Sequence, residues 1–201
     1  MKFVTASNHN YFGCLMVQIA HIKMFFGSLP IVYDLGLTQE QKETLEVLGL
    51  LTIASPPCPE EGNGYPEGYR PRALFKPGVL LEICEKHPEE DIVYLDADCR
   101  PMKRFEFPTK GIGLVEADYI HGPLWEYVGP YHAGIIFLKS RPDRIDFLTQ
   151  WHEDLWNDHL PSDTKSLNKV AKNGRITILS KEEYLAEVIS PKTKVLHVKG
   201  L

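Results

Sequence analysis

IVYLDADCRP, residues 92–101, is a run of β-forming side chains that ends abruptly in two aspartates. Ile92–Leu95 lead directly into Asp96 and Asp98, with only Ala97 between the two carboxylates. This pattern fits the polar end of a buried strand, and it fits a pair of metal ligands equally well. A D-x-D pattern arises by chance about once in a chain of this size, so the motif alone does not separate the two interpretations.

The residues before this stretch alternate between strand and helix patterns. Apolar runs and apolar residues at helical spacing predict strand, helix, strand, helix and strand in turn. The predicted ranges are 2–6, 11–27, 30–37, 39–49 and 50–54. Gly27 is placed to end the first helix, and Thr38 and Gly49 to cap and end the second. This order favours a mostly parallel sheet with helices on both faces, an α/β fold in a single domain over residues 1–201.

The pattern continues after a loop at residues 55–71, which holds five prolines and three glycines. A loop of this length inside a compact domain is typically functional or mobile. The further ranges are helices at 72–87, 141–158 and 162–174, with Ser162 as the N-cap of the last, and strands at 91–97, 111–117, 133–140, 175–180 and 193–198. His132 stands at the beginning of its strand, next to small residues, so we expect that strand to run antiparallel to its neighbours.

Composition narrows the setting in which the protein works. The net charge is −5, which gives no general attraction to nucleic acid or to an anionic membrane. Four scattered cysteines without a C-x-x-C pair favour reduced thiols, and hence a cytoplasmic chain. We find no signal-peptide pattern and no apolar stretch near the roughly 20 residues needed to span a bilayer.

Ligands of open parallel sheets bind beyond the carboxyl ends of the strands, where several chemically useful side chains are expected here. Asp96 and Asp98 are oxygen ligands of the kind that suit Mg²⁺ or Mn²⁺, and an imidazole such as His197 would favour Mn²⁺. The alternative for His197 is an ordinary hydrogen-bonded histidine near the terminus.

The turn after the first strand, SNHNYFG, lacks the G-x-G-x-x-G pattern of dinucleotide sites. Ser7 and Asn8 supply hydrogen-bonding groups and Tyr11 an aromatic face, which suit a nucleobase and a ribose. The alternative is an ordinary loop whose polar residues cap a helix.

Taken in order, these segments resemble the nucleotide-sugar glycosyltransferases of GT-A fold, specifically the glycogenin-like family 8 and its small bacterial and viral relatives. The resemblance spans about residues 2–200. The matching segments are TASNHNYFGCL, Lys76 in LFKPGVLLEI, IVYLDADCRP, Asp118 in EADYIH, HAGIIFLKS, SDTKSLN and HVKG. The sequence departs from the family pattern at His132, where the family has Asn, and at Thr164, where it has Gln.

The resemblance implies a metal-dependent transfer of a hexose from a UDP-sugar, with retention of anomeric configuration. It implies Mn²⁺ (or Mg²⁺) on Asp96, Asp98 and His197. Ser7, Asn8, Tyr11 and Asp96 would contact the nucleoside, and Lys199 and Gly200 the diphosphate. Lys76 and Asp118 would orient the donor sugar, His132 would lie at the acceptor edge, and Asp163 beneath the anomeric carbon.

Other interpretations of single residues stay open. Lys76 fits a solvated lysine at a helix start, Asp163 fits a carboxylate that favours the helix dipole, and Asp118 fits a turn residue. Cys99 is interpreted as a bystander to the metal site. For the whole chain the alternatives are a degenerate, non-catalytic sugar-nucleotide-binding protein and a D-x-D phosphatase of the haloacid-dehalogenase type.

The acceptor and the donor sugar are not readable from the sequence. A glycan, a lipid-linked sugar, a protein or a modified nucleic-acid base would each fit, and the acidic net charge disfavours DNA. The oligomeric state is equally open.

Overall fold

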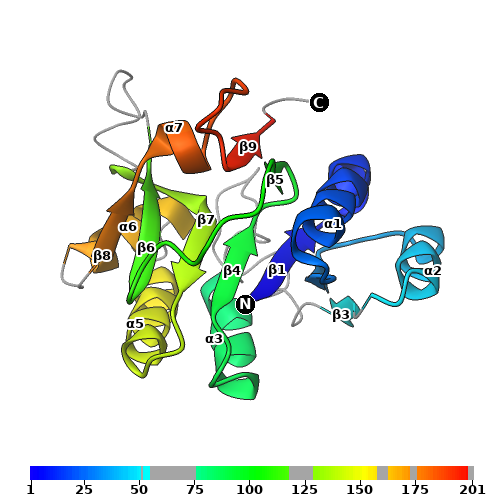
Figure 1. Cartoon of the computed structure of the whole chain (residues 1–201). Helices are drawn as coiled ribbons and strands as arrows, with labels where there is room; N and C mark the ends of the chain where they lie inside the picture. The colour runs from blue at the N-terminus through cyan, green and yellow to red at the C-terminus, as the bar shows by residue number, and fades with distance from the viewer. Residues whose placement is uncertain (51, 55–75, 118–128, 158–162, 173–175, 199–201) are drawn as a thin grey trace.

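The computed structural model describes residues 1–50, 52–54, 76–117, 129–157, 163–172 and 176–198 (Figure 1). The strands are β1 (Lys2–Ser7), β2 (Ile31–Asp34), β3 (Thr52–Ala54), β4 (Ile92–Leu95), β5 (Cys99–Pro101), β6 (Ile112–Glu116), β7 (Tyr131–Leu138), β8 (Ile176–Leu179) and β9 (Val195–His197). The helices are the 3-10 turn η1 (His9–Tyr11), α1 (Phe12–Phe26), α2 (Gln39–Val47), α3 (Lys76–Lys86), α5 (Asp143–Asn157), α6 (Asp163–Ala171) and α7 (Lys181–Tyr184).

Seven strands form one sheet in the order β3-β2-β1-β4-β7-β6-β8. All neighbouring pairs are parallel except those of β7, which runs antiparallel to β4 and to β6. The predicted mostly parallel sheet and the predicted antiparallel strand are therefore confirmed. Because β7 is reversed, its first residues lie at the same edge as the carboxyl ends of β1, β4 and β6.

The central strands carry apolar side chains on both faces because helices cover both faces of the sheet. Ile92 and Tyr94 of β4 belong to a core that includes α3, α5 and α6. Val93 and Leu95 point to the opposite face, into a core shared with α1 and α7. This double burial explains why residues 92–95 form an uninterrupted apolar run in the sequence.

The helix ends follow the predicted chemistry. Gly27 takes a left-handed conformation with φ of 69° and closes α1, which a residue with a Cβ adopts at a cost. The Thr38 side chain accepts a hydrogen bond from the Gln41 backbone N–H in a complete capping box at the start of α2. Gly49, with φ of 72°, follows that helix.

A second, two-stranded sheet pairs β5 with β9 in antiparallel fashion. It lies beyond the carboxyl end of β4, close to α7 (Figure 1). The sequence predicted the strand at residues 193–198, but β5 and this pairing were not foreseen. Within the described ranges, no helix has the length and apolarity that crossing a bilayer requires.

A buried arginine joins α5 to the end of α3. Arg144 is 2% exposed, and its guanidinium donates to four backbone oxygens. These acceptors are the carbonyl oxygens of Cys84, His87, Pro88 and Glu90, at 2.6–3.2 Å. The guanidinium thus binds the Cys84 carbonyl in the last turn of α3 and three carbonyls of the segment that follows the helix.

Replacing Arg144 with Met is therefore expected to destabilise the fold by about 2–3 kcal/mol, because buried carbonyl groups lose their donors. The measurement is the free energy of unfolding from urea titrations. Arg141→Met is the matched control, since the Arg141 side chain is 55% exposed and its contacts are long, 3.6 Å to Asp143 and 3.4 Å to the Lys110 carbonyl; a change below about 0.5 kcal/mol is expected there. Equal losses in the two variants would contradict the assignment.

Candidate active site

The turn that carries the two aspartates is held by backbone contacts and by one buried side chain. The Cys99 N–H donates to the Asp96 carbonyl at 2.8 Å, and the Asp96 N–H donates to the Gly134 carbonyl of β7 at 2.8 Å. From α1, the fully buried Gln18 amide donates to the carbonyl oxygens of Asp96, at 2.7 Å, and Cys99, at 2.5 Å. The role of Gln18 was not predicted from the sequence. The signal was a polar residue among the apolar positions of the first predicted helix.

Asp98 and His197 come together at this turn, although they lie far apart in the sequence. The small sheet places His197 opposite Cys99, and the Val198 N–H donates to the Asp98 carbonyl at 3.0 Å. His197 Nε2 is 3.5 Å from Asp98 Oδ2. Burial alone would raise the pKa of Asp98, but its hydrogen bond and charge interaction with His197 outweigh burial and lower it. Asp98 is therefore an ionised carboxylate beside an imidazole.

Cys99 is the third member of the metal-capable cluster found among the described residues, whose ligand atoms lie within 4.8 Å of one another. The Cys99 thiol is fully buried and donates to Asp98 Oδ1 at 3.7 Å. Burial raises its pKa well above the usual value, so the thiol is neutral at neutral pH. Cys99 thus lies beside the two proposed ligands, and its role as a bystander stays a prediction.

Asp96 faces away from this cluster, toward Lys76 at the start of α3. Lys76 Nζ lies 3.1 Å from Asp96 Oδ1 and 2.8 Å from Asp163 Oδ2, and donates to the Ala133 carbonyl at 3.0 Å. The Tyr94 hydroxyl donates to the same Asp96 oxygen at 2.7 Å. The three predicted metal ligands are thus assembled only in part: Asp98 and His197 meet, whereas the Asp96 carboxylate is engaged by Lys76 and Tyr94.

Lys76 is the cationic centre of this group of side chains. Burial on its own would lower the pKa of Lys76, but the carboxylates of Asp163 and Asp96 reverse that effect and hold it well above its usual value. The ammonium is therefore charged at neutral pH. The Lys76 side chain is 11% exposed, which is far less than expected of the solvated lysine that was the alternative.

Asp163 is the first residue of α6, and its carboxylate binds both the backbone of the helix start and Lys76. Its Oδ1 accepts from the Thr164 N–H at 2.7 Å, while its Oδ2 pairs with Lys76. The Trp151 indole N–H donates to the Asp163 carbonyl at 3.1 Å and fixes this helix start. The carboxylate accordingly serves the helix start and the site at once. Asn168, one turn later, bonds the backbone of Tyr131 through its amide oxygen and nitrogen, both at 2.8 Å, which ties α6 to the start of β7.

His132 lies at the same edge and is in contact with His197. Their ring centroids are 5.2 Å apart. Burial lowers the pKa of His132 to about 4, so the ring is neutral at neutral pH. Its Nδ1 accepts from the Gly134 N–H at 2.9 Å, which leaves the proton of the neutral ring on Nε2. A Cβ on Gly134 would come within 2.6 Å of an Asp96 oxygen and 2.5 Å of the His132 ring, so glycine permits this close packing.

In the turn after β1, two of the three predicted nucleoside contacts bind the protein's own backbone. The Asn8 side-chain oxygen accepts from the N–H groups of Asn10 and Tyr11 and caps η1. Ser7 is 2% exposed and donates to the Asn8 carbonyl at 3.2 Å. Tyr11 is 40% exposed. Of the three predicted nucleoside contacts, only Tyr11 presents a substantially exposed side chain, whereas Asn8 fills the helix-capping role that was the alternative.

Three predicted site residues lie outside the described residues: Asp118, Lys199 and Gly200. So do the loop at residues 55–71 and the predicted N-cap Ser162. Their assignments stay predictions.

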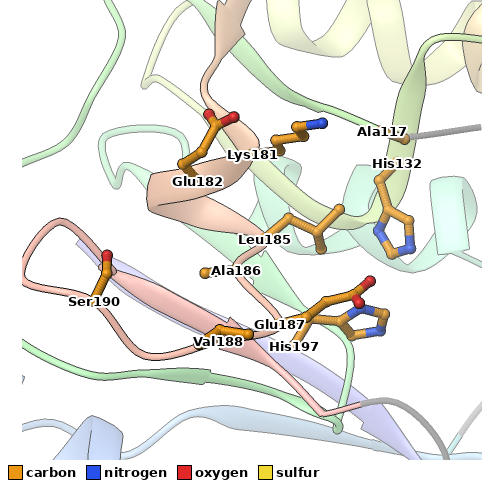
Figure 2. A pocket seen from close by; sticks show the side chains of 10 residues that line it. All are labelled: Ala117, His132, Lys181, Glu182, Leu185, Ala186, Glu187, Val188, Ser190 and His197. Carbon is orange, nitrogen blue, oxygen red and sulfur yellow. The ribbon is translucent and has the colours of Figure 1, made fainter. Parts of the chain in front are cut away.

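A pocket of about 430 Å³ opens beside the two histidines, between the start of β7, α7 and β9 (Figure 2). His132 and His197 form one side of it. Lys181 and Glu182 of α7 and Glu187 of the following loop bring charged groups to it. The volume falls in the range of small-molecule sites, about 300–1,000 Å³.

The donor set fits a divalent ion. Asp98 supplies a carboxylate oxygen and His197 an imidazole nitrogen, and their 3.5 Å separation is close to the roughly 3 Å between adjacent ligands of one octahedral ion. The nitrogen of His197 that faces Asp98 is Nε2, whereas Nδ1 is buried without a hydrogen-bond partner among the described residues. Asp96, whose Oδ1 is engaged by Lys76 and Tyr94, would complete the set as a third ligand.

The fold places the protein in a structural class. A mostly parallel sheet with one antiparallel strand, in which an acidic pair follows the fourth strand, is the GT-A fold of glycosyltransferases. Among solved structures it is shared by the galactosyltransferase LgtC, in complex with donor and acceptor sugar analogues, at a TM-score of 0.64 and 13% identity. That match covers 100% of this chain and 87% of LgtC.

Two further glycosyltransferases share the fold. One is involved in glycosylation of the major capsid of PBCV-1 (TM-score 0.55, 12% identity, 100% of this chain and 96% of that one). The other is GlyE of Streptococcus pneumoniae TIGR4 (TM-score 0.56, 14% identity, 99% of this chain and 55% of that one). No protein-family model and no curated protein sequence matches the chain. Identities this low establish the fold and leave activity to be argued from the site.

Proposed function

We propose that the protein is a metal-dependent glycosyltransferase that moves a hexose from a UDP-sugar to an acceptor, with retention of anomeric configuration. The observation that supports this most directly is the convergence of Asp98 and His197 beside the Lys76–Asp163 ion pair, at the carboxyl edge of the sheet. Four separate elements supply these side chains. In a fold of this class, that edge is where a nucleotide-sugar is expected to bind.

The reaction breaks the bond between the anomeric carbon and a phosphate oxygen, and charge grows on the departing diphosphate. A divalent ion on Asp98 and His197, with Asp96, would act as a Lewis acid toward that charge. The fixed ammonium of Lys76 adds a positive charge that needs no reorganisation as the bond breaks. Lys199 and Gly200 are proposed to contact the diphosphate, as the family resemblance implies.

The carboxylate of Asp163 is proposed to lie beneath the anomeric carbon, where it would stabilise positive charge on the sugar ring. Its ion pair with Lys76 holds it in one orientation and keeps it from serving as a free base. This supports a mechanism with retention, in which no strong base is required, over one in which a carboxylate deprotonates the acceptor. Asp118 is proposed to orient hydroxyl groups of the donor sugar.

The test is a panel of UDP-sugars, each incubated with the protein and Mn²⁺ and scored for release of UDP. We expect one hexose donor to be hydrolysed faster than the others, and chelation of the metal to stop the release. Tight UDP binding without release from any donor would instead support a degenerate binding protein. Release of inorganic phosphate from phosphomonoesters would support the phosphatase alternative.

A further inference from the structure

The pocket beside the two histidines contains a carboxylate, Glu187, that no step proposed above uses. Glu187 lies on the loop after α7, and the residue before it is fixed against β9. The Ala186 N–H donates to the Val195 carbonyl at 3.2 Å, and the His197 N–H donates to the Ala186 carbonyl at 2.9 Å. The backbone at Glu187 is therefore tied directly to the strand that carries His197.

The Glu187 side chain is aimed at the reacting edge. Figure 2 shows its carboxylate projecting toward the rings of His132 and His197, while Lys181 and Glu182 lie on the opposite side of the pocket. The position suits a group that meets a second substrate close to the bond being made.

The pocket and the first turn lie on opposite sides of β4 and its acidic pair, which suits an acceptor site in the pocket. In the sheet order, β1 with the first turn is on one side of β4, and β7 and β6 are on the other. His132 begins β7, and Ala117, which also lines the pocket, follows β6. A nucleoside near the first turn and an acceptor in this pocket would thus be separated by the diphosphate and the donor sugar.

The charges of the pocket narrow the chemistry of the acceptor. Two carboxylates, Glu182 and Glu187, stand against one ammonium, Lys181, on a protein whose net charge is −5. A polyanion such as nucleic acid would be repelled. The aliphatic side chains of Leu185 and Val188 give the pocket an apolar wall, which suits the C–H face of a sugar ring, while carboxylates suit its hydroxyl groups.

We propose that Glu187 is an acceptor-binding residue, whose carboxylate accepts a hydrogen bond from a hydroxyl group of a neutral saccharide in this pocket. The inference rests on the proposed transferase function, and it adds a residue and an acceptor class to it.

The experiment measures saccharide binding and turnover separately. Binding of methyl glucoside, methyl galactoside, lactose and maltose is followed by saturation-transfer NMR in the presence of UDP and Mg²⁺, which needs no reaction. Turnover is followed as UDP release from the UDP-sugar, without acceptor and with each saccharide. The variants are Glu187→Gln and Val188→Trp, the latter at a site 78% exposed, where a larger side chain narrows the pocket without disturbing the core.

We expect at least one saccharide to bind, and Glu187→Gln to weaken its binding and the stimulated UDP release by about 10-fold or more, the cost of one hydrogen bond to a charged group. Val188→Trp should have the same selective effect. UDP release without acceptor should stay within about twofold of wild type in both variants. Glu46→Gln, which removes one exposed carboxylate from the distant helix α2, should change neither measurement.

Three results would overturn the proposal: no saccharide of the panel binds, Glu187→Gln binds as wild type does, or Glu187→Gln loses acceptor-free UDP release by the same factor as stimulated release. The last result would assign Glu187 to the donor. A different result would contradict the proposed transferase function: the wild-type protein releases no UDP from any donor. That result does not depend on the NMR measurement.

Discussion

Replacing Asp98 with Asn is expected to lower metal-dependent UDP release by about 1,000-fold, because a Lewis-acid metal site contributes several kcal/mol of transition-state stabilisation. Asp98 is the residue on which the proposed metal site depends most, since it alone of the acidic pair approaches His197. Asn keeps the size of the side chain and one of its two oxygens but removes its charge. The folded structure should therefore persist.

Two measurements separate loss of the metal from loss of the fold. Titration of Mn²⁺ in the presence of UDP should show weaker binding in Asp98→Asn, whereas the thermal unfolding midpoint without metal should change little. Glu46→Gln also removes one carboxylate charge and serves as the control for net charge. A variant Asp98→Asn that keeps Mn²⁺-dependent UDP release within tenfold of wild type would exclude Asp98 as a ligand.

Replacing Lys76 with Met should both abolish activity and cost about 3–4 kcal/mol of stability. Removing one partner of a buried ion pair leaves the others uncompensated, and Asp163 and Asp96 would then face each other without a cation. The Asp96 side chain is 34% exposed, so solvent softens the effect and we expect a value in the lower part of the usual range.

The destabilisation of Lys76→Met should shrink in acid, because a proton on one carboxylate replaces the missing positive charge. Urea titrations at several pH values measure this. Lys86→Met is the control on the same helix: Lys86 forms an exposed i,i+4 pair with Glu82, worth about 0.3–0.5 kcal/mol. If the double variant Lys76→Met with Asp163→Asn is no more stable than Lys76→Met alone, carboxylate repulsion is not the cause.

Much of the fold was predictable because its signals are local. The apolar run of β4, the Thr38 cap and the Gly27 helix end each depend on residues that are neighbours in the sequence. The antiparallel direction of β7 was predicted from one observation: His132, a candidate site residue, stands at the beginning of the strand and not at its end. These elements need little tertiary context to be recognised.

The arrangement of the candidate site could not be predicted from the sequence. Nothing in the sequence says that Asp96 turns toward Lys76 while Asp98 turns toward His197, because the bend between them is set by Gln18 and Gly134 from other elements. β5 has three residues and ends in Pro101, too short for an alternation pattern to show. Asn8 looked like a nucleoside contact because capping and ligand binding use the same amide groups.

The small sheet of β5 and β9 has a thermodynamic consequence. Asp98 immediately precedes one of its strands and His197 ends the other, so an ion held by both residues would bridge the two strands. Any such ion favours the closed pairing over a frayed C-terminal segment by its binding free energy, in proportion to its concentration. Conversely, each opening of β9 would take the proposed site apart and release the ion. Metal binding and the pairing of β9 with β5 would then form one coupled equilibrium, and an ion bound with the nucleotide would protect β9 from exchange and proteolysis.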